Sequence, residues 1–377
     1  MSEFQYYEFR AVDRALTRAE MAEMREVSSR GEITSSSYSN TYHWGDFKGD
    51  PGDWMNRFFD AFIYYANWGT RELSFRLPKA VLSEDLVAQY CNDETLTCRV
   101  SGQHIVVNFH SPDEREWENY AYQDIGLSEF MALRQELASG DYRCLYLGWL
   151  VANDWESVEY EDEDEELENL EPPVPPGLGE LTAAQESFVE LFEIDRGLLA
   201  AAAMASAPLR QKKASETDFH HWVLGLPATQ KDELLVHLLG ENGTGPALEL
   251  RARFERETAP LVPGWAQGKR RTAKELIGLG AEIRDRRKRA KAEAETAERK
   301  RYLDDLMARI PEAWAHIESL VELKNVKYYD EAMTLLVPMR DLALRGDLPD
   351  WKVRIDEFRL RHRTKRALID RLQNAGI

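Results

Sequence analysis

Short runs of alternating hydrophobic and polar positions fill the first 150 residues and predict a β-sheet there. Residues 4–9 form an aromatic-rich run typical of a strand, residues 33–44 are rich in Ser, Thr and Tyr, and residues 73–77 alternate with a period of two. Residues 95–100 and 104–109 are two further β-rich runs separated by a Ser-Gly-Gln segment. This last pair predicts an antiparallel hairpin.

Helical patterns interrupt these runs. Residues 17–20, Thr-Arg-Ala-Glu, are a capping box and predict a helix that continues to about Val27. Asp53 is suited to cap a second helix, because apolar side chains then recur on one face at Trp54, Phe58, Phe62 and Tyr65. Two more helices are predicted over residues 128–138 and 142–152. The expected fold of residues 1–157 is therefore an α+β domain with a short antiparallel sheet.

Beyond residue 181 the apolar positions recur at helical spacing and carry no strand signal. We expect a helical domain over residues 181–266 that opens with a capping box at Thr182, a long basic helix within residues 267–310 that Pro311 ends, and a helical bundle over residues 311–377. The bundle is predicted to hold helices at residues 312–323, 329–344, 350–361 and 365–374. The fold class is therefore an α+β N-terminal domain followed by an all-α module.

The distribution of charge adds a linker to this organisation. The 377 residues include 48 Lys and Arg against 67 Asp and Glu, a net charge of −19. Eleven acidic residues and no basic residue lie between Asp154 and Glu171, and a Pro-rich stretch follows. Self-repulsion and proline stiffness predict an extended, solvated linker over residues 158–180. It is a spacer, or else an acidic element that competes for a basic partner surface or offers an exposed site to a protease.

Basic residues concentrate in the predicted long helix. Residues 268–301 hold thirteen basic and six acidic side chains, a local charge of +7 in an acidic chain. Three interpretations stay open: a solvated helix or one that pairs with the acidic linker, a site for an acidic protein partner, or a site for nucleic acid. The candidate residues for binding a polyanion or an acidic partner are Lys269, Arg270, Arg271, Arg284, Arg286, Arg287, Lys288, Arg289 and Lys291.

Residues 42–54 form a second candidate site. Aromatic side chains alternate there with Gly, Pro and Asp, a composition typical of a recognition surface, because rigid aromatics offer a large contact area at little entropic cost. Trp44 and Phe47 are alternatively expected to pack beneath the loop. The candidate partner-binding residues are Tyr42, His43, Trp44, Asp46, Phe47, Lys48 and Trp54.

The sequence favours neither a metal, a cofactor nor an enzyme. Cys91 and Cys98 are too far apart for a zinc pair, and the acids of residues 46–53 lack the alternate spacing of a calcium loop. No nucleophile elbow, phosphate-binding loop, zinc-protease motif or dinucleotide fingerprint is present. A hydrolase is favoured only if a pocket gathers His43, Asp46 or a cysteine. Without a signal pattern or a membrane-length apolar run, we expect a soluble, cytoplasmic protein that does not enter membranes.

Segments of the C-terminal module resemble the helical tail of bacterial SWIM-type zinc-finger proteins. The resemblance rests on residues 329–332, 335–336, 340–343, 358–363, 368–372 and 375–376; the Cys-x-Cys and Cys-x-His ligands of the zinc finger are missing. Residues 42–50, 66–71 and 171–179 similarly resemble an uncharacterised bacterial protein family. These resemblances imply a bacterial cytoplasmic protein with a helical interaction module, and they supply no catalytic residue.

The leading hypothesis is a non-enzymatic regulatory or scaffold protein. Its N-terminal domain would bind one protein through residues 42–54, and its helical module would bind another. One version places the protein in a bacterial stress or defence operon, controlled by masking or by cleavage of the acidic linker. The competing hypothesis is nucleic-acid binding through residues 269–301.

Overall fold

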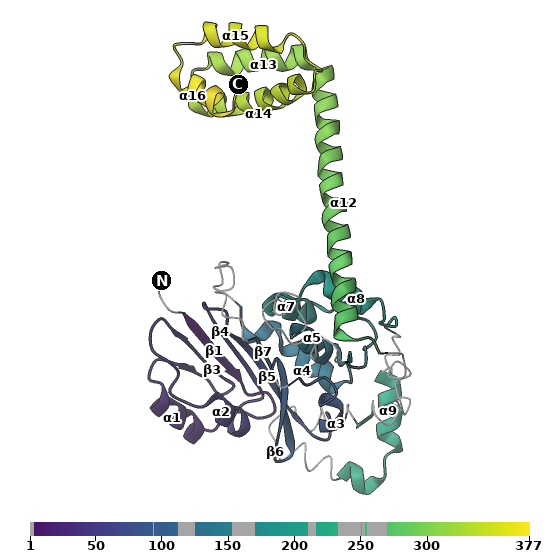
Figure 1. Cartoon of the computed structure of the whole chain (residues 1–377). Coiled ribbons are helices and arrows are strands. Elements are labelled where there is room, and N and C mark those ends of the chain that lie inside the picture. The colour runs from purple at the N-terminus through teal and green to yellow at the C-terminus, as the bar shows by residue number, and fades with distance from the viewer. Residues whose placement is uncertain are drawn as a thin grey trace. The chain divides into compact units, whose positions relative to one another are not determined.

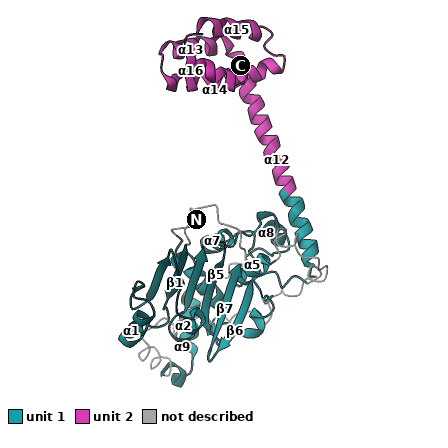
Figure 2. Cartoon of the chain, turned by 60° about the vertical axis from the view of Figure 1, so that its left-hand side comes forward, with its two compact units in different colours: residues 1–284 teal, residues 285–377 magenta. Residues whose placement is uncertain are grey.

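The computed structural model describes residues 4–92, 94–111, 125–152, 170–209, 216–232, 250, 253–254 and 270–377. The chain divides into two compact units, residues 1–284 and residues 285–377 (Figure 1, Figure 2). The boundary falls within one long helix, α12 (Ala273–Ala308). The two units are described in turn.

The described part of unit 1 contains a seven-stranded antiparallel sheet with the strand order β2-β3-β1-β4-β5-β7-β6. The strands predicted at residues 4–9 and 73–77 and the predicted hairpin are confirmed, whereas the run at residues 33–44 is divided between two paired strands, β2 and β3. Gly102, with φ of +60°, lies in the hairpin turn. The strands are β1 (Gln5–Arg10), β2 (Glu32–Ile33), β3 (Ser37–Tyr42), β4 (Ala61–Ala66), β5 (Arg71–Pro78), β6 (Leu96–Ser101) and β7 (His104–Ser111).

The predicted helix beginning at Asp53 and reaching Tyr65 is wrong. The helix there, α2 (Pro51–Arg57), is short and is capped by Asp50, whose side chain accepts a hydrogen bond from the backbone of Asp53 at 3.1 Å. The chain then forms β4, which lies between β1 and β5 in the middle of the sheet. A strand covered on both faces is apolar at successive positions, so its side chains matched a helical period by coincidence.

One face of the sheet is covered by helices that share its main core (Figure 1). The predicted helices at residues 128–138 and 142–152 are confirmed. We expected residues 181–266 to form a helical domain of their own, but the first two helices of that range pack in the same core as the sheet. The helices of this layer are α4 (Met131–Ala138), α5 (Arg143–Val151), α7 (Ala183–Leu191) and α8 (Arg196–Ala203), and the shorter elements nearby are α3 (Glu84–Val87) and η2 (Leu127–Glu129). Another helix of unit 1 is α9 (Glu216–Gly225).

The other face of the sheet is partly covered by α1 (Arg18–Val27) and α2. Both capping boxes predicted from the sequence, at Thr17 and Thr182, are present. The core of this layer is a cluster of aromatic rings from β1, β3, β4, α2 and the segments before and after α2: Phe9, Tyr38, Phe47, Trp54, Phe58, Phe59 and Phe62. Beside this cluster, the same face carries polar side chains of β5, β7 and β6.

The expected linker is only partly described. Its acidic residues 154–169 lie outside the described residues. Residues 170–180, which we expected to be solvated, pack against unit 1: Glu171 is 1% exposed, and Tyr90 donates a hydrogen bond to the carbonyl of Pro173 at 2.9 Å.

Helix α12 is continuous over 36 residues. Its first turns pack on α8, where Gly197 and Gly280 approach so closely that a Cβ on Gly197 would lie 2.5 Å from the Gly280 carbonyl oxygen. Every residue from 285 to 302 is exposed. Leu303 and Leu306 then enter the core of unit 2.

Unit 2 is a helical bundle, and the four helices predicted for it are confirmed. They are α13 (Ile310–Glu322), with Pro311 in its first turn, α14 (Val326–Leu344), with Pro338 inside it, α15 (Trp351–Arg361) and α16 (Arg366–Asn374). Trp314, Ile317, Leu336, Phe358 and Leu368 form its core. Among the helices that the structure describes, none has both the length and the apolar character needed to cross a membrane.

Candidate functional site

The loop between β3 and α2 exposes one large aromatic side chain. We name residues 43–50 the Trp44 loop. Trp44 is 73% exposed, whereas Phe47 is 9% and Trp54 4% exposed. The rings of Phe47 and Trp54 meet edge to face at 4.8 Å. Phe47 therefore packs beneath the loop, as the alternative interpretation predicted, and Trp44 does not.

The Trp44 loop is held to the sheet by polar contacts. Gln5 on β1 donates hydrogen bonds to the Asp46 carboxylate at 2.8 Å and to the Gly45 carbonyl at 3.3 Å. Gly45 has a φ of +75°, a conformation that favours glycine. Tyr42, at the end of β3, packs edge-on against Tyr7. The loop thus presents Trp44 from a fixed base.

His43 and Lys48 complete the exposed part of the loop. Both are exposed, and the ring of His43 lies 5.9 Å from that of Phe4 and 6.4 Å from that of Trp44. Among the candidate partner-binding residues, His43, Trp44, Asp46 and Lys48 are exposed, Tyr42 is half-buried, and Phe47 and Trp54 belong to the core.

A row of polar side chains crosses the sheet behind this loop. The hydroxyls of Tyr7 and Tyr64 both donate to the side-chain oxygen of Gln5, at 3.0 and 3.2 Å. Tyr64 on β4 stands opposite Glu72 on β5, which stands opposite His110 on β7. Burial raises the pKa of Tyr64 to about 12, and the nearby charges of Asp46 and Glu72 add to this effect.

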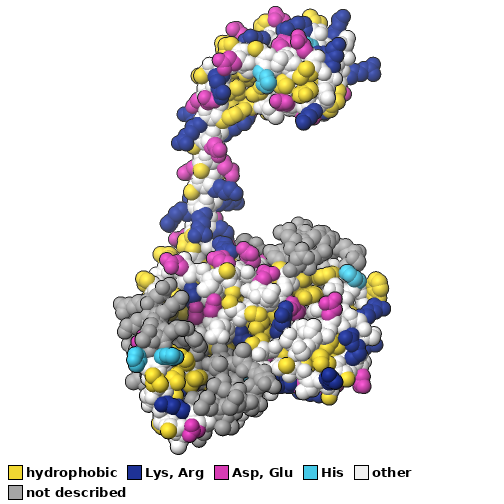
Figure 3. All heavy atoms as spheres, turned by 180° about the vertical axis from the view of Figure 1, so that it is seen from behind, with side chains coloured by type: hydrophobic (Ala, Val, Ile, Leu, Met, Phe, Trp, Pro, Cys, Tyr) yellow, Lys and Arg dark blue, Asp and Glu magenta, His cyan; other side chains and the backbone are white. Residues whose placement is uncertain are grey.

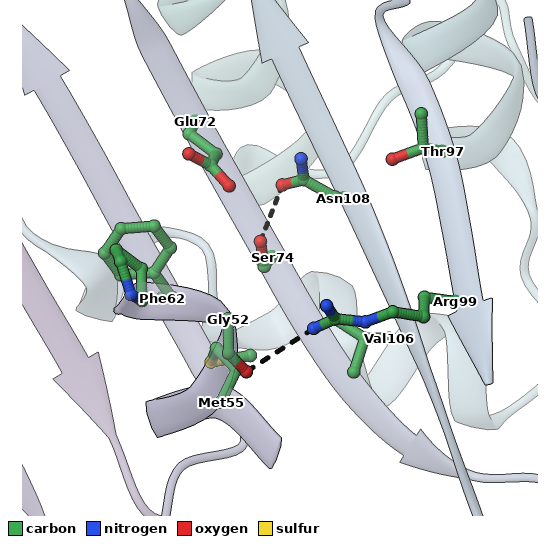
Figure 4. A pocket seen from close by; sticks show the side chains of 10 residues that line it. Gly52, Met55, Phe62, Glu72, Ser74, Thr97, Arg99, Val106 and Asn108 are labelled. Carbon is green, nitrogen blue, oxygen red and sulfur yellow. Dashed lines mark hydrogen bonds between the residues drawn. The ribbon is translucent and has the colours of Figure 1, made fainter. Parts of the chain in front are cut away.

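Next to α2, the same sheet face holds a cavity of about 230 Å³, which we name the sheet cleft (Figure 4). Gly52 and Met55 of α2 form one wall. Ser74 donates to the side-chain oxygen of Asn108 at 2.6 Å on the floor. The remaining lining comes from Pro51, Phe62, Glu72, Thr97, Arg99 and Val106.

Glu72 is a largely buried acid without a cationic partner. No ion pair to its carboxylate is present among the described residues, and the amide of Asn108 is its hydrogen-bond partner. Burial raises the pKa of Glu72 to about 7, although the Asn108 hydrogen bond acts in the opposite direction. Burial also lowers the pKa of His110, the residue opposite Glu72 on β7.

Arg99 is a cation without an acidic partner at the other side of the sheet cleft. Its guanidinium approaches the Gly52 carbonyl at 3.4 Å and the Asn56 side-chain oxygen at 3.5 Å, which are long contacts (Figure 4). No carboxylate pairs with it within the described ranges. The cleft therefore holds one unpaired charge of each sign.

The sheet cleft lacks an activated nucleophile. Ser74 donates its proton to an amide oxygen, which cannot act as a base. The residues that the hydrolase hypothesis requires, His43, Asp46 or a cysteine, do not line this cavity. The arrangement is suited to binding rather than to acyl transfer.

Sequence analysis missed the sheet cleft. The available signal was the period of two in β5, which places Glu72, Ser74 and Arg76 on one face. Arg99 and Asn108 belong to the predicted hairpin, but only the register of the sheet brings them beside Glu72.

The basic candidates divide into two groups. Lys269 lies outside the described residues. Arg271 pairs with Glu171 through two contacts of 2.6 and 2.7 Å, Arg270 donates to the Glu171 carbonyl, and Arg284 pairs with Asp195 at 3.4 Å. These three arginines are engaged within the chain, and Arg270 and Arg271 meet the last residue of the acidic stretch, which was one of the alternatives considered.

The other group lies on the exposed stretch of α12. Arg286, Arg287, Lys288, Arg289 and Lys291 are exposed, and Lys and Arg side chains occur on several sides of this stretch (Figure 3). Lys291 forms a loose pair with Glu295 at 4.0 Å, one turn away. A helix charged on all sides is stabilised mainly by such neighbouring pairs.

No family model, curated protein or solved structure matches this chain. Within the described residues, no group of three or more His, Cys, Asp or Glu side chains is placed to hold a metal ion.

Proposed function

We propose that the chain is a non-enzymatic regulatory or scaffold protein that binds one protein partner through the Trp44 loop and another through unit 2. The observation that carries the proposal is the exposure of Trp44 on a loop whose other large apolar side chain, Phe47, is buried. Tryptophan is enriched among the residues that dominate binding energy at protein interfaces. Burying this indole against a partner would remove a large apolar surface from water.

The surroundings of Trp44 support a protein partner. His43, Asp46 and Lys48 form a polar rim around the indole, and such a rim is typical of protein interfaces. Because Gln5, Phe47 and Trp54 hold the loop in place, little conformational entropy is lost on binding.

Unit 2 carries several exposed apolar side chains. Leu323, Val326, Leu344, Val353 and Leu360 are each more than half exposed. Exposed leucines and valines on a bundle with a well-formed core support a role in association. The version in which a protease of a stress or defence operon cuts the acidic linker concerns residues 154–169, outside the described ones, and stays a prediction.

Matched variants of the full-length chain test this proposal. The tagged wild type, Trp44→Ala and Leu344→Ala are each expressed in a bacterial host and recovered with their bound proteins, which are identified by mass spectrometry. We expect Trp44→Ala to lose one stoichiometric partner that Leu344→Ala retains. Full recovery of every wild-type partner by Trp44→Ala would exclude the loop as a docking site.

The second candidate function is nucleic-acid binding through α12. It is favoured by one observation: all eighteen residues from 285 to 302 are exposed, including five basic residues within 286–291. A polyanion approaching from any side would meet some of these cations.

Salt dependence tests the second function. Binding of a fluorescent duplex would weaken steeply as salt rises, and replacing residues 286–289 with Glu would flatten that dependence. Lys352→Glu, an exposed lysine on α15, is the control. Unchanged binding by the four-residue variant would remove α12 from consideration.

A further inference from the structure

The sheet cleft contains two charged side chains of opposite sign that form no ion pair among the described residues. Glu72 is largely buried and Arg99 exposed, and within the described residues neither has an ionic partner. An unpaired buried carboxylate is costly, and proteins keep such groups mainly where they have a function. A ligand that supplied both an ammonium and an anionic group would pair both residues.

The register of the sheet sets the length of that ligand. Glu72 stands opposite His110, and Arg99 stands opposite Val106, four residues along β7. The backbones of Glu72 and Arg99 are thus separated by about 13 Å along the strands and about 10 Å across them. Figure 4 shows the two side chains on opposite sides of the Ser74–Asn108 pair. A free α-amino acid, whose charges share one carbon, is too short to reach both.

The middle of the sheet cleft is polar on its floor and apolar at one wall. Ser74, Thr97 and Asn108 supply hydroxyl and amide groups, and Met55 and Phe62 supply the apolar wall. At about 230 Å³ the cavity is smaller than the roughly 300–1,000 Å³ clefts that hold drug-sized ligands. An extended peptide advances about 3.4 Å per residue, so a peptide of two or three residues is about 7–10 Å long and is small enough for this cavity.

We propose that the sheet cleft binds a zwitterionic peptide of two or three residues, with its ammonium at Glu72, its carboxylate at Arg99 and its peptide groups over Ser74, Asn108 and Thr97. The proposal concerns a small ligand and does not depend on the docking role of the Trp44 loop.

Binding of such a peptide would depend on pH. The titratable groups beside Glu72 are Tyr64 from β4 and His110 from β7, and Arg99 is the charged group contributed by β6. The lining residues from α2, which are Pro51, Gly52 and Met55, do not titrate. Because the pKa of Glu72 is raised to about 7, acid protonates this carboxyl and removes the partner of the ammonium. Affinity is expected to fall as the pH decreases below 7.

Isothermal titration calorimetry of the full chain with Ala-Ala and Ala-Ala-Ala tests the proposal. We expect at least one of the two to bind at about pH 7.5, where the peptide ammonium is still largely protonated, and its N-acetylated and C-amidated forms to bind about tenfold or more weakly, since each lacks one charge-assisted contact. Alanine is the length control and should not bind. Absence of binding by both peptides, or equal binding by the capped forms, would overturn the proposal.

Two variants test which cleft residue binds each end of the peptide. Glu72→Gln should weaken binding of the free peptide about tenfold and leave binding of the N-acetylated peptide unchanged. Arg99→Gln should weaken binding of the free peptide by a similar factor and leave binding of the C-amidated peptide unchanged. Lys352→Gln, an exposed residue of α15 outside the cleft, should bind the peptide as the wild type does. If either cleft variant does not fold, the capped peptides decide the question on the wild-type chain.

Discussion

Buried charges in unit 1 fall into a paired and an unpaired kind. The Asp60 carboxylate is fully buried and accepts hydrogen bonds from the Arg76 guanidinium at 2.7 and 3.0 Å and from the backbone of Val12 and Asp13 at 2.7 and 2.9 Å. Four donors compensate for its lost hydration. Glu72, on β5, has only the amide of Asn108 as a partner among the described residues. The first arrangement stabilises the fold, and the second leaves binding capacity for a ligand.

At Asp60, removing the carboxylate should destabilise the chain. Asp60→Ala leaves Arg76 buried without its counter-charge, and we expect a loss of about 3–5 kcal/mol in the free energy of unfolding. The control is Asp53→Ala, which breaks the half-exposed pair with Arg57 and should cost less than about 1 kcal/mol. Urea unfolding followed by tryptophan fluorescence measures both. Equal losses in the two variants would contradict the structural role of Asp60.

At Glu72, the effect on stability should depend on pH. The raised pKa means that the folded chain holds the Glu72 carboxyl protonated at a pH where the unfolded chain has already released this proton. The resulting loss of unfolding free energy is absent below about pH 4.5 and grows as the pH rises to 7. Glu72→Gln removes this cost. Relative to the wild type, the variant should therefore gain about 2 kcal/mol in unfolding free energy between pH 5 and pH 8. A difference between the two proteins that does not change with pH would show that Glu72 ionises normally.

At the scale of elements, the sequence signals were reliable where the residues of a single helix or strand decide its secondary structure. The capping boxes at Thr17 and Thr182 are present as predicted, and Pro311 lies in the first turn of α13, just after the long helix has ended at Ala308. The boundary between α2 and β4 was not predictable, because a strand covered on both faces carries the same apolar residues as a buried helix. The sheet cleft was missed for a related reason: its residues meet only through the pairing of β5, β7 and β6.

The exposed stretch of α12 is the element most independent of tertiary packing. Ala292→Pro should break the helix locally, at a cost of about 3 kcal/mol in helix stability, without unfolding either core. Limited trypsin digestion should then cut between Arg286 and Arg301, where we expect the intact wild-type helix to be cut more slowly. Ala292→Ser, which keeps the helix, is the control. Loss of the unfolding transition of either unit in the proline variant would contradict an independent helix.

At the scale of the whole chain, unit 1 contains a contact between residues that are 100 positions apart in the sequence. Residues 170–171 and 271–272 form a short antiparallel bridge in which Glu171 donates its backbone N–H to the Arg271 carbonyl at 2.8 Å. The Glu171 carboxylate accepts hydrogen bonds from Arg271 and from the Tyr146 hydroxyl. From the sequence we expected Glu171 to be solvated like the other acids of its stretch. Its burial depends on Arg271, which is too distant in the sequence for a local pattern to reveal.

Breaking this contact should destabilise unit 1. Arg271→Ala leaves Glu171, 1% exposed, without its cation, and we expect a loss of about 3 kcal/mol or more. Arg196→Ala, which breaks an exposed pair with Glu186, is the matched control and should cost less than about 1 kcal/mol. Thermal unfolding monitored by circular dichroism distinguishes the two. If Arg271→Ala destabilises the chain no more than the control does, the buried Arg271–Glu171 pair does not stabilise unit 1.

We propose that this chain binds proteins rather than nucleic acid. The most direct test is to recover the tagged full-length protein from a bacterial host at physiological salt, identify what co-purifies, and read absorbance at 260 nm on the same fractions. We predict a stoichiometric protein partner, lost in Trp44→Ala, with no excess absorbance at 260 nm. Salt-sensitive nucleic acid without a protein partner would contradict the claim and assign the function to the exposed stretch of α12.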